Sequence, residues 1–171
     1  MLKPAALLIA SLIAPQSAQA TGDIAFPQEG VWSCVEPAVI SGHEAIVRSE
    51  VSYPAPGRFE SEGIATLYLP AEKEVRIALT GAGEFTVDGD QLTSVYTSIS
   101  AVPTEPYGFT EAETDYLNDW QAYLISGFEG IKGRVLDQFF RPHSENSFDL
   151  VAIVGGEEKI VSCQRQEDLI G

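Results

Sequence analysis

The sequence predicts a mainly β fold, a single antiparallel up-and-down β-barrel of about eight or nine strands with one inserted amphipathic helix. Three observations predict it. Apolar and polar residues alternate with a period of two over most of the chain, between turns rich in Gly, Pro and Asp. A single segment has the periodicity of a helix. The only two cysteines, Cys34 and Cys163, lie in the first and last strand-like segments, which become neighbours when a meander closes. The alternative is an open sheet with the helix across one face.

The first half of the chain predicts strands joined by tight turns. From Glu44 to Tyr53, for example, Ala45, Val47 and Val51 share one face of a half-buried strand. The expected strands are 31–36, 44–53, 59–69, 74–80, 85–87 and 91–102, and the expected turns are 54–57, 70–72, 81–83 and 88–89. Because each strand is followed at once by the next, the pattern indicates an antiparallel meander.

The pattern changes at Pro103, after which residues 104–109 are expected to form a loop. Thr110 and Glu113 have the spacing of a helix capping box. Apolar residues then recur with helical spacing up to a stop near Gly127, at Tyr116, Leu117, Trp120, Tyr123 and Leu124. Alternation resumes with expected strands at 131–140, 148–154 and 159–165. The sequence therefore predicts one helix before the last three strands.

The N-terminus has the pattern of a secretory signal peptide. Lys3 precedes an apolar run over residues 5–14, and small residues place cleavage after Ala20. The run is too short for a comfortable membrane span. We therefore expect residues 1–20 to be a signal peptide, residues 21–171 to be one domain without a membrane span, and the protein to be periplasmic or secreted. Disulfides persist in such compartments, so Cys34 and Cys163 are predicted to pair, the alternative being two buried thiols.

The composition is strongly acidic, with 25 Asp and Glu against 10 Lys and Arg and a formal net charge of -15. A surface of this sign repels phosphate backbones, so nucleic-acid binding is disfavoured. The acidic residues are dispersed along the chain, which argues against a disordered acidic tail. The charge is explained either by solubility or by attraction to a cationic partner.

Gly30-Val31-Trp32 on the first strand, the meander over 59–69 and 75–79, and the hairpin pattern over 83–92 resemble the small lipocalin-like (calycin) domains of exported bacterial proteins. The resemblance covers most of residues 21–171. It implies a β-barrel that holds a small ligand, with Trp32 packed across its closed end. Two features depart from lipocalins. Lipocalins have a Thr-Asp-Tyr motif near a strand turn, whereas Thr114-Asp115-Tyr116 lies inside the helical pattern of this sequence. The helix of lipocalins follows the barrel, whereas the helix expected here precedes the last three strands.

The residues do not predict an enzyme. His43, at a strand start, and His143, expected in a turn, are the only histidines, and two distant histidines do not make a metal site, which needs three or four ligands. The sequence contains no Gly-x-Ser-x-Gly nucleophile signature, and Gly81-Ala82-Gly83 has no helix behind it to bind phosphate. No catalytic residue, metal or cofactor is therefore assigned.

The leading functional prediction is an exported protein that binds a small, partly apolar ligand inside the barrel. A small barrel is either filled with side chains or holds one ligand, and the sequence does not choose between the two. Large aromatic residues on the inward positions would mean a filled core, whereas small inward residues, as at 63–65 and 94–98, would mean a cavity. The candidate ligand-binding residues are Trp32, Arg48, Arg76, Tyr96, Trp120 and Tyr123. An inward-facing arginine would bind an acidic ligand group, and the aromatic helix face would either form a lid or pack in the core.

The alternative prediction is a module that binds a cationic protein, for example an inhibitor of a basic cell-wall hydrolase. The closing Cys163-Gln164 and the disulfide-linked barrel are distantly similar to the bacterial lysozyme inhibitors. The acidic surface would steer association with a basic enzyme. Those inhibitors are much shorter, and their Ser-Gly loop motif has no convincing counterpart in this sequence.

Overall fold

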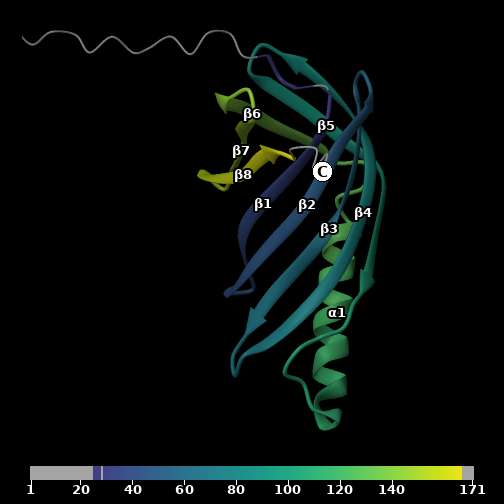
Figure 1. The fold of residues 1–171 in the computed structure, drawn as a ribbon. Helices are drawn as coiled ribbons and strands as arrows, with labels where there is room; N and C mark the ends of the chain where they lie inside the picture. The colour runs from purple at the N-terminus through teal and green to yellow at the C-terminus, as the bar shows by residue number, and fades with distance from the viewer. Residues whose placement is uncertain (1–24, 28, 167–171) are drawn as a thin grey trace, which may run out of the picture.

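The computed structural model describes residues 25–27 and 29–166, so the expected signal peptide lies outside the described residues. Figure 1 shows an elongated barrel whose long strands run along its whole length. The strands are β1 (Val31–Ile40), β2 (His43–Ala55), β3 (Arg58–Leu69), β4 (Lys73–Asp88), β5 (Gln91–Pro103), β6 (Val135–Ser144), β7 (Ser147–Val154) and β8 (Glu157–Arg165). A short 3-10 helix (Glu111–Glu113) leads into α1 (Thr114–Glu129).

Every strand pairs antiparallel with the next, and β8 pairs with β1, so the eight strands form a closed barrel. This confirms the predicted fold class and rejects the open-sheet alternative. It is also compatible with a lipocalin-like barrel. The β1–β8 contact is short, from Trp32 opposite Arg165 to Val35 opposite Ser162.

The turn predicted at residues 81–83 is wrong, because β4 continues through them to Asp88. Here the glycines make room for aromatic rings. A Cβ atom on Gly81 would lie 2.7 Å from the Tyr96 ring, and one on Gly83 would lie 2.5 Å from the Phe59 ring. The register between β4 and β5 shifts between Ala82 and Gly83, because Thr97 of β5 is an extra residue between their partners Ser98 and Tyr96, and β4 continues without a turn. One strand therefore replaces two, and the count is eight.

Three boundaries in the second half also differ from the prediction. The helix continues through Gly127 to Glu129, since a single glycine costs a helix only about 1 kcal/mol. The strand predicted from residue 131 begins at Val135. It then continues through Pro142 to Ser144, with a register shift at Pro142 that accommodates the missing N–H. His143 therefore lies in a strand and not in the expected turn.

The barrel wall is complete in only one half of the molecule. β6 pairs with only the first part of β5, Gln91–Val95, and β8 with only Trp32–Val35 of β1. We call this the closed half. In the other half, the helix half, α1 packs against β4 and β5 where three short strands do not reach (Figure 1). The helix thus takes the place of strands in the wall.

Each half has its own hydrophobic core. The upper core, in the closed half, consists of Phe26, Trp32, Cys34, Phe59, Phe85, Leu92, Phe140, Phe148 and Cys163. The lower core, in the helix half, consists of Ala45, Leu67, Leu69, Val75, Ile77, Ala101 and Leu124. Leu124 is the buried residue that α1 contributes, and it joins the helix to the sheet. The space between the two cores is therefore available for a cavity.

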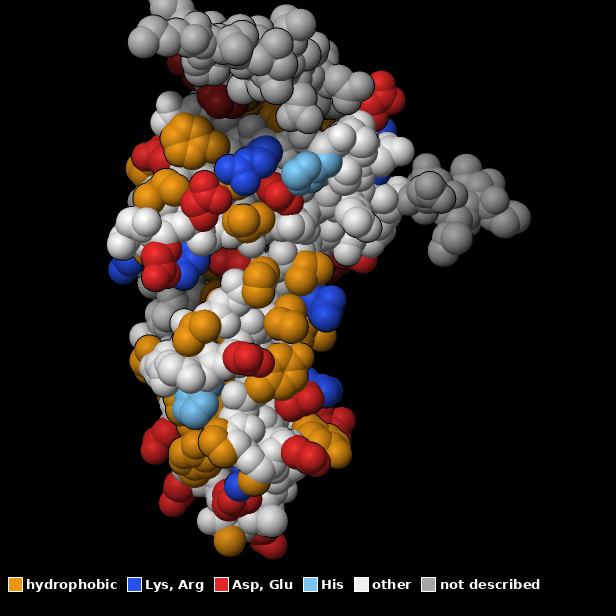
Figure 2. All heavy atoms as spheres, turned by 90° about the vertical axis from the view of Figure 1, so that its left-hand side faces the viewer, with side chains coloured by type: hydrophobic (Ala, Val, Ile, Leu, Met, Phe, Trp, Pro, Cys, Tyr) orange, Lys and Arg blue, Asp and Glu red, His pale blue; other side chains and the backbone are white. Residues whose placement is uncertain are grey.

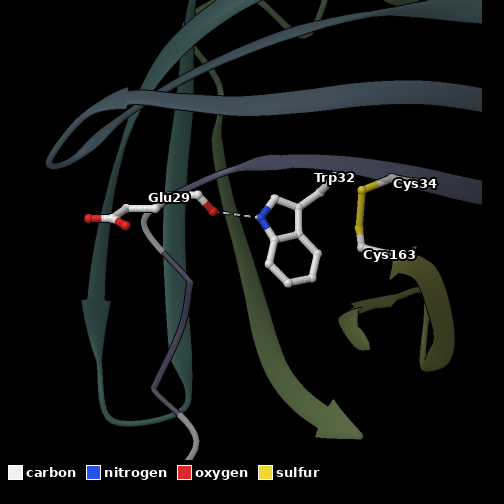
Figure 3. The surroundings of a disulfide bond; sticks show 4 residues. All are labelled: Glu29, Trp32, Cys34 and Cys163. Atoms are coloured by element: carbon white, nitrogen blue, oxygen red, sulfur yellow. Dashed lines mark hydrogen bonds between the residues drawn. A yellow bond between two sulfur atoms is a disulfide. The ribbon is translucent and has the colours of Figure 1, made fainter. Parts of the chain in front are cut away.

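The closed half is held by Trp32 and the predicted disulfide, which Figure 3 shows close together near the start of β1. Cys34 and Cys163 are directly opposite each other in the β1–β8 pairing. The Trp32 side chain is only 1% exposed, and its indole N–H donates a 3.0 Å hydrogen bond to the carbonyl of Glu29. The Arg165 guanidinium lies 5.9 Å from the indole ring centre.

The start of α1 is fixed to the start of β4. Thr110 and Glu113 form the predicted capping box. Glu113 also pairs with Lys73, and the hydrogen bonds from Lys73 and Thr110 lower the pKa of Glu113 to about 2. The preceding loop adds two backbone hydrogen bonds of 3.0 Å between Glu74 and Tyr107. The helix therefore has a defined position over the sheet.

Candidate ligand cavity

A cavity of about 810 Å³ lies inside the barrel between the upper and lower cores. It exists because inward positions at the middle of the long strands carry small residues. These are Ser49 on β2, Ser61 and Gly63 on β3, Gly81 on β4 and Ser94 on β5. Gly63 and Ser94 belong to the segments in which small residues were expected to face inward. The other small residues of these segments differ. Ala65 is buried but does not line the cavity, and Ser98 lines a groove on the outer face.

Most of the remaining wall is apolar. Phe59 and Phe85 bound the cavity on the side of the upper core, and Leu79, Ile99 and Val161 lie along its sides. A few polar groups converge on this apolar space, including serine hydroxyls and the carboxylates of Glu36, Glu62 and Asp137. This composition is typical of small-molecule sites.

The cavity lining reaches the surface where the wall is incomplete. Beyond Val35, β1 has no pairing with β8. The lining there includes four side chains that are about half exposed or more, Tyr123 of α1, Val135 of β6 and Ile153 and Val154 of β7. Figure 2 views the molecule from the side of the short strands and shows hydrophobic side chains across the middle of that face. A ligand would find an apolar rim at this opening.

Glu36 places a carboxylate in the cavity lining. It follows Cys34 on β1 by two residues and therefore shares its inward face. Burial raises the pKa of Glu36 above its usual value of 4.5. Among the residues that the structure describes, no cation forms an ion pair with Glu36. Lys159 also lines the cavity, but its amine lies 3.0 Å from the Glu157 carboxylate.

Two tyrosines bring phenol groups to the same cavity. Burial raises the pKa of Tyr96, a hydrogen bond with Ser61 partly offsets this rise, and the negative charge of Glu36 adds to it. The pKa of Tyr53 is also raised, mainly by burial. Both phenols are therefore neutral near pH 7. Their rings are held edge-on against phenylalanines, Tyr96 against Phe59 at 4.9 Å between centroids and Tyr53 against Phe85 at 5.4 Å.

Of the six candidate binding residues from the sequence, Tyr96 and Tyr123 line the cavity. Trp32 is buried in the upper core, and Trp120 packs against the lower core with its ring 5.4 Å from that of His43. Arg48 and Arg76 alternate with inward-facing neighbours and do not line the cavity. Arg76 instead hydrogen-bonds the Glu74 carboxylate at 2.9 Å. Neither arginine is placed to bind a ligand in the cavity.

Sequence reasoning missed Glu36 and Tyr53 as cavity residues. A signal for Glu36 was present, because Trp32, Cys34 and Glu36 have the same parity on one strand. Glu36 was nevertheless not predicted to line the cavity, because the strand was expected to end at Pro37 and a residue at a strand end is normally solvated. In the structure β1 continues to Ile40, so Glu36 lies in mid-strand.

The part of the chain that the structure describes contains no group of three or more His, Cys, Asp or Glu side chains that could hold a metal ion. His143 pairs with Asp149 at 2.8 Å on the surface. None of the described helices is long and apolar enough to cross a membrane.

A second concavity of about 550 Å³ lies mainly on the outer face of β2–β5, and we call it the outer groove. It is acidic, with Glu50, Glu60 and Glu62 in its lining. Glu50 lies directly opposite Glu62 in the β2–β3 pairing, and the amide of Gln166 donates a 2.5 Å hydrogen bond to Glu50. A solvated acidic face is the simplest account of this groove.

Comparison with protein-family models and with curated proteins found no match for this chain.

Glu36 makes the stability of the fold dependent on pH. A raised pKa means that the folded protein binds the Glu36 proton more tightly than the unfolded chain does, so its stabilising effect is complete below about pH 4.5 and is lost as the pH rises through the raised value. We expect Glu36→Gln to increase the free energy of unfolding near pH 8, on the order of 1 kcal/mol. The neighbouring Tyr96 is neutral throughout this range and does not contribute.

Urea unfolding of both proteins at several pH values between about 4 and 8 checks this expectation. The two curves of stability against pH should converge at the acidic end and separate as the pH rises. Parallel curves would show that Glu36 is fully solvated and titrates normally.

Proposed function

We propose that the protein is an exported, lipocalin-like binding protein that holds a small, partly apolar molecule inside the barrel. The main support for this proposal is the cavity of about 810 Å³ inside the barrel. Small-molecule sites in proteins usually measure about 300 to 1,000 Å³ and combine apolar walls with a few convergent polar groups. This cavity has that size and composition, and its lining reaches the surface.

Export is supported by the disulfide between Cys34 and Cys163, since such bonds persist in oxidising compartments. The signal-peptide pattern of residues 1–20 supports it independently. The closed eight-stranded barrel with Trp32 in its closed half supports the lipocalin-like assignment. A periplasmic or secreted carrier accounts for all of these features.

Binding of a neutral apolar fluorophore, N-phenyl-1-naphthylamine, tests the proposal. Ala152 on β7 lines the cavity, and we expect Ala152→Trp to weaken binding by about tenfold or more, because the indole occupies ligand space. The matched control is Ala78→Trp on β4, which is equally half-buried but lies between inward-facing Ile77 and Leu79 and points outward. It should leave the affinity unchanged.

Two results would contradict the proposal. The first is a wild-type protein that binds no apolar probe. The second is an equal loss of binding in both tryptophan variants, because that would place the probe on the surface or reveal a general loss of structure.

A further inference from the structure

Glu36 presents its carboxylate to a cavity in which the described residues supply no partner cation. We propose that the cavity selects small amphipathic amines, whose ammonium group pairs with Glu36 while the apolar part lies against the surrounding wall. This inference rests on the proposed function and specifies the chemical class of the ligand.

The first argument is the cost of an unpaired carboxylate in the cavity lining. A carboxylate that is removed from water and has no counter-charge is unfavourable, whereas a pair with good geometry recovers much of that cost. A ligand ammonium supplies the missing charge and up to three hydrogen-bond donors. Glu36 therefore contributes more to binding than to the stability of the ligand-free fold.

The second argument is that the groups around Glu36 can also bind an ammonium ion. Tyr96 is near enough to feel its charge, and Tyr53 lines the same cavity, so two electron-rich rings are available to a cation. The hydroxyls of Ser49 and Ser61 line the cavity as well and can accept further N–H hydrogen bonds. Of the other lining carboxylates, Glu62 also lines the outer groove and Asp137 accepts a hydrogen bond from Thr93. Glu36, together with the phenol rings and hydroxyls, therefore suits an ammonium group.

The same arrangement disfavours carboxylic acids such as fatty acids. Glu36 would repel a ligand carboxylate inside the cavity. Lys159 is the cation in the described lining, and its amine already pairs with Glu157. Arg48 and Arg76 lie outside the cavity. An acidic ligand would therefore be repelled by Glu36 without being attracted by an unpaired cation in the described lining.

The test compares decylamine, decanol and decanoate, which share one alkyl chain and differ in the head group. Each is titrated near pH 8 at low salt against wild-type protein loaded with N-phenyl-1-naphthylamine, and its affinity is read from displacement of the fluorophore. We expect the amine to bind about 10- to 100-fold more tightly than the alcohol, as a charge-assisted hydrogen bond implies, and the acid to bind most weakly.

Glu36→Gln should remove the difference between decylamine and decanol and leave decanol binding intact. The control is Glu60→Gln in the outer groove, which removes the same charge from an exposed position that does not line the cavity. It should retain the preference for the amine. Because the wild-type comparison needs no variant, the proposal stays testable even if a variant folds poorly.

The outcomes separate the two proposals. If all three probes bind equally, the cavity binds ligands but the amine selectivity is wrong. A preference for decylamine that survives Glu36→Gln would overturn the pairing with Glu36, because the preference would then come from other carboxylates of this acidic protein. If the fluorophore and all three probes fail to bind, the proposed function itself is wrong.

Discussion

Loss of the disulfide is expected to lower the free energy of unfolding by about 5 kcal/mol, the chain-entropy estimate for the long loop that it closes. The bond joins residues separated by 129 positions. It also links the two strands with the shortest pairing in the barrel, since β1 and β8 pair over only four positions, from Trp32 to Val35. The double variant Cys34→Ala, Cys163→Ala removes the bond without burying new polar groups.

Urea unfolding of this variant, compared with oxidised and with reduced wild-type protein, measures the effect. The variant and the reduced protein should be destabilised to a similar extent. A loss below about 1 kcal/mol would show that strand pairing and the upper core hold β8 in place without the cross-link. The same variant should bind apolar probes less tightly, because β8 contributes Val161 to the cavity wall.

Trp32→Ala is expected to destabilise the fold by about 4 kcal/mol, in the range for removing a buried aromatic ring. Trp32 is 1% exposed and packs 4.8 Å from Phe148. Its removal leaves a cavity in the upper core and deprives both the Glu29 carbonyl and the Arg165 guanidinium of their contacts. The matched control is Trp120→Ala on α1, where the ring is only partly buried, and we expect a loss of about 2 kcal/mol.

Thermal or urea unfolding of both tryptophan variants checks this order. A smaller loss for Trp32 than for Trp120 would mean that the helix, and not the closed half, supplies most of the stability of the barrel.

Several features of the fold could be predicted because they depend on neighbours in sequence. Alternation in β2 and β3 put Ala45 and Leu67 on the buried face, and the structure buries both. The capping box at Thr110 and Glu113 marked the start of the helical region, since it requires only local spacing. Arg48 and Arg76, in contrast, were candidates for ligand binding if they faced inward, and the structure does not place either in the cavity lining.

Other features could not be predicted because local sequence does not specify them. Gly81 and Gly83 have the composition of a turn, but their function depends on Tyr96 and Phe59, rings from other strands. Ser98 was expected to face inward, but the register shift at Ala82 and Gly83 reverses its side. Both errors arise from contacts between strands, which the pattern within one strand does not specify.

The sequence by itself determined the strand alternation, the single helix, the cysteine pair and the acidic charge, because each is a property of residue type or short-range spacing. Only the tertiary structure decided that β6–β8 cover half of the barrel, that α1 fills the rest of the wall, and that a cavity with Glu36 remains between two cores. A cavity is the volume that packing leaves unfilled. It depends on how all the elements meet, and no single segment of the chain encodes it.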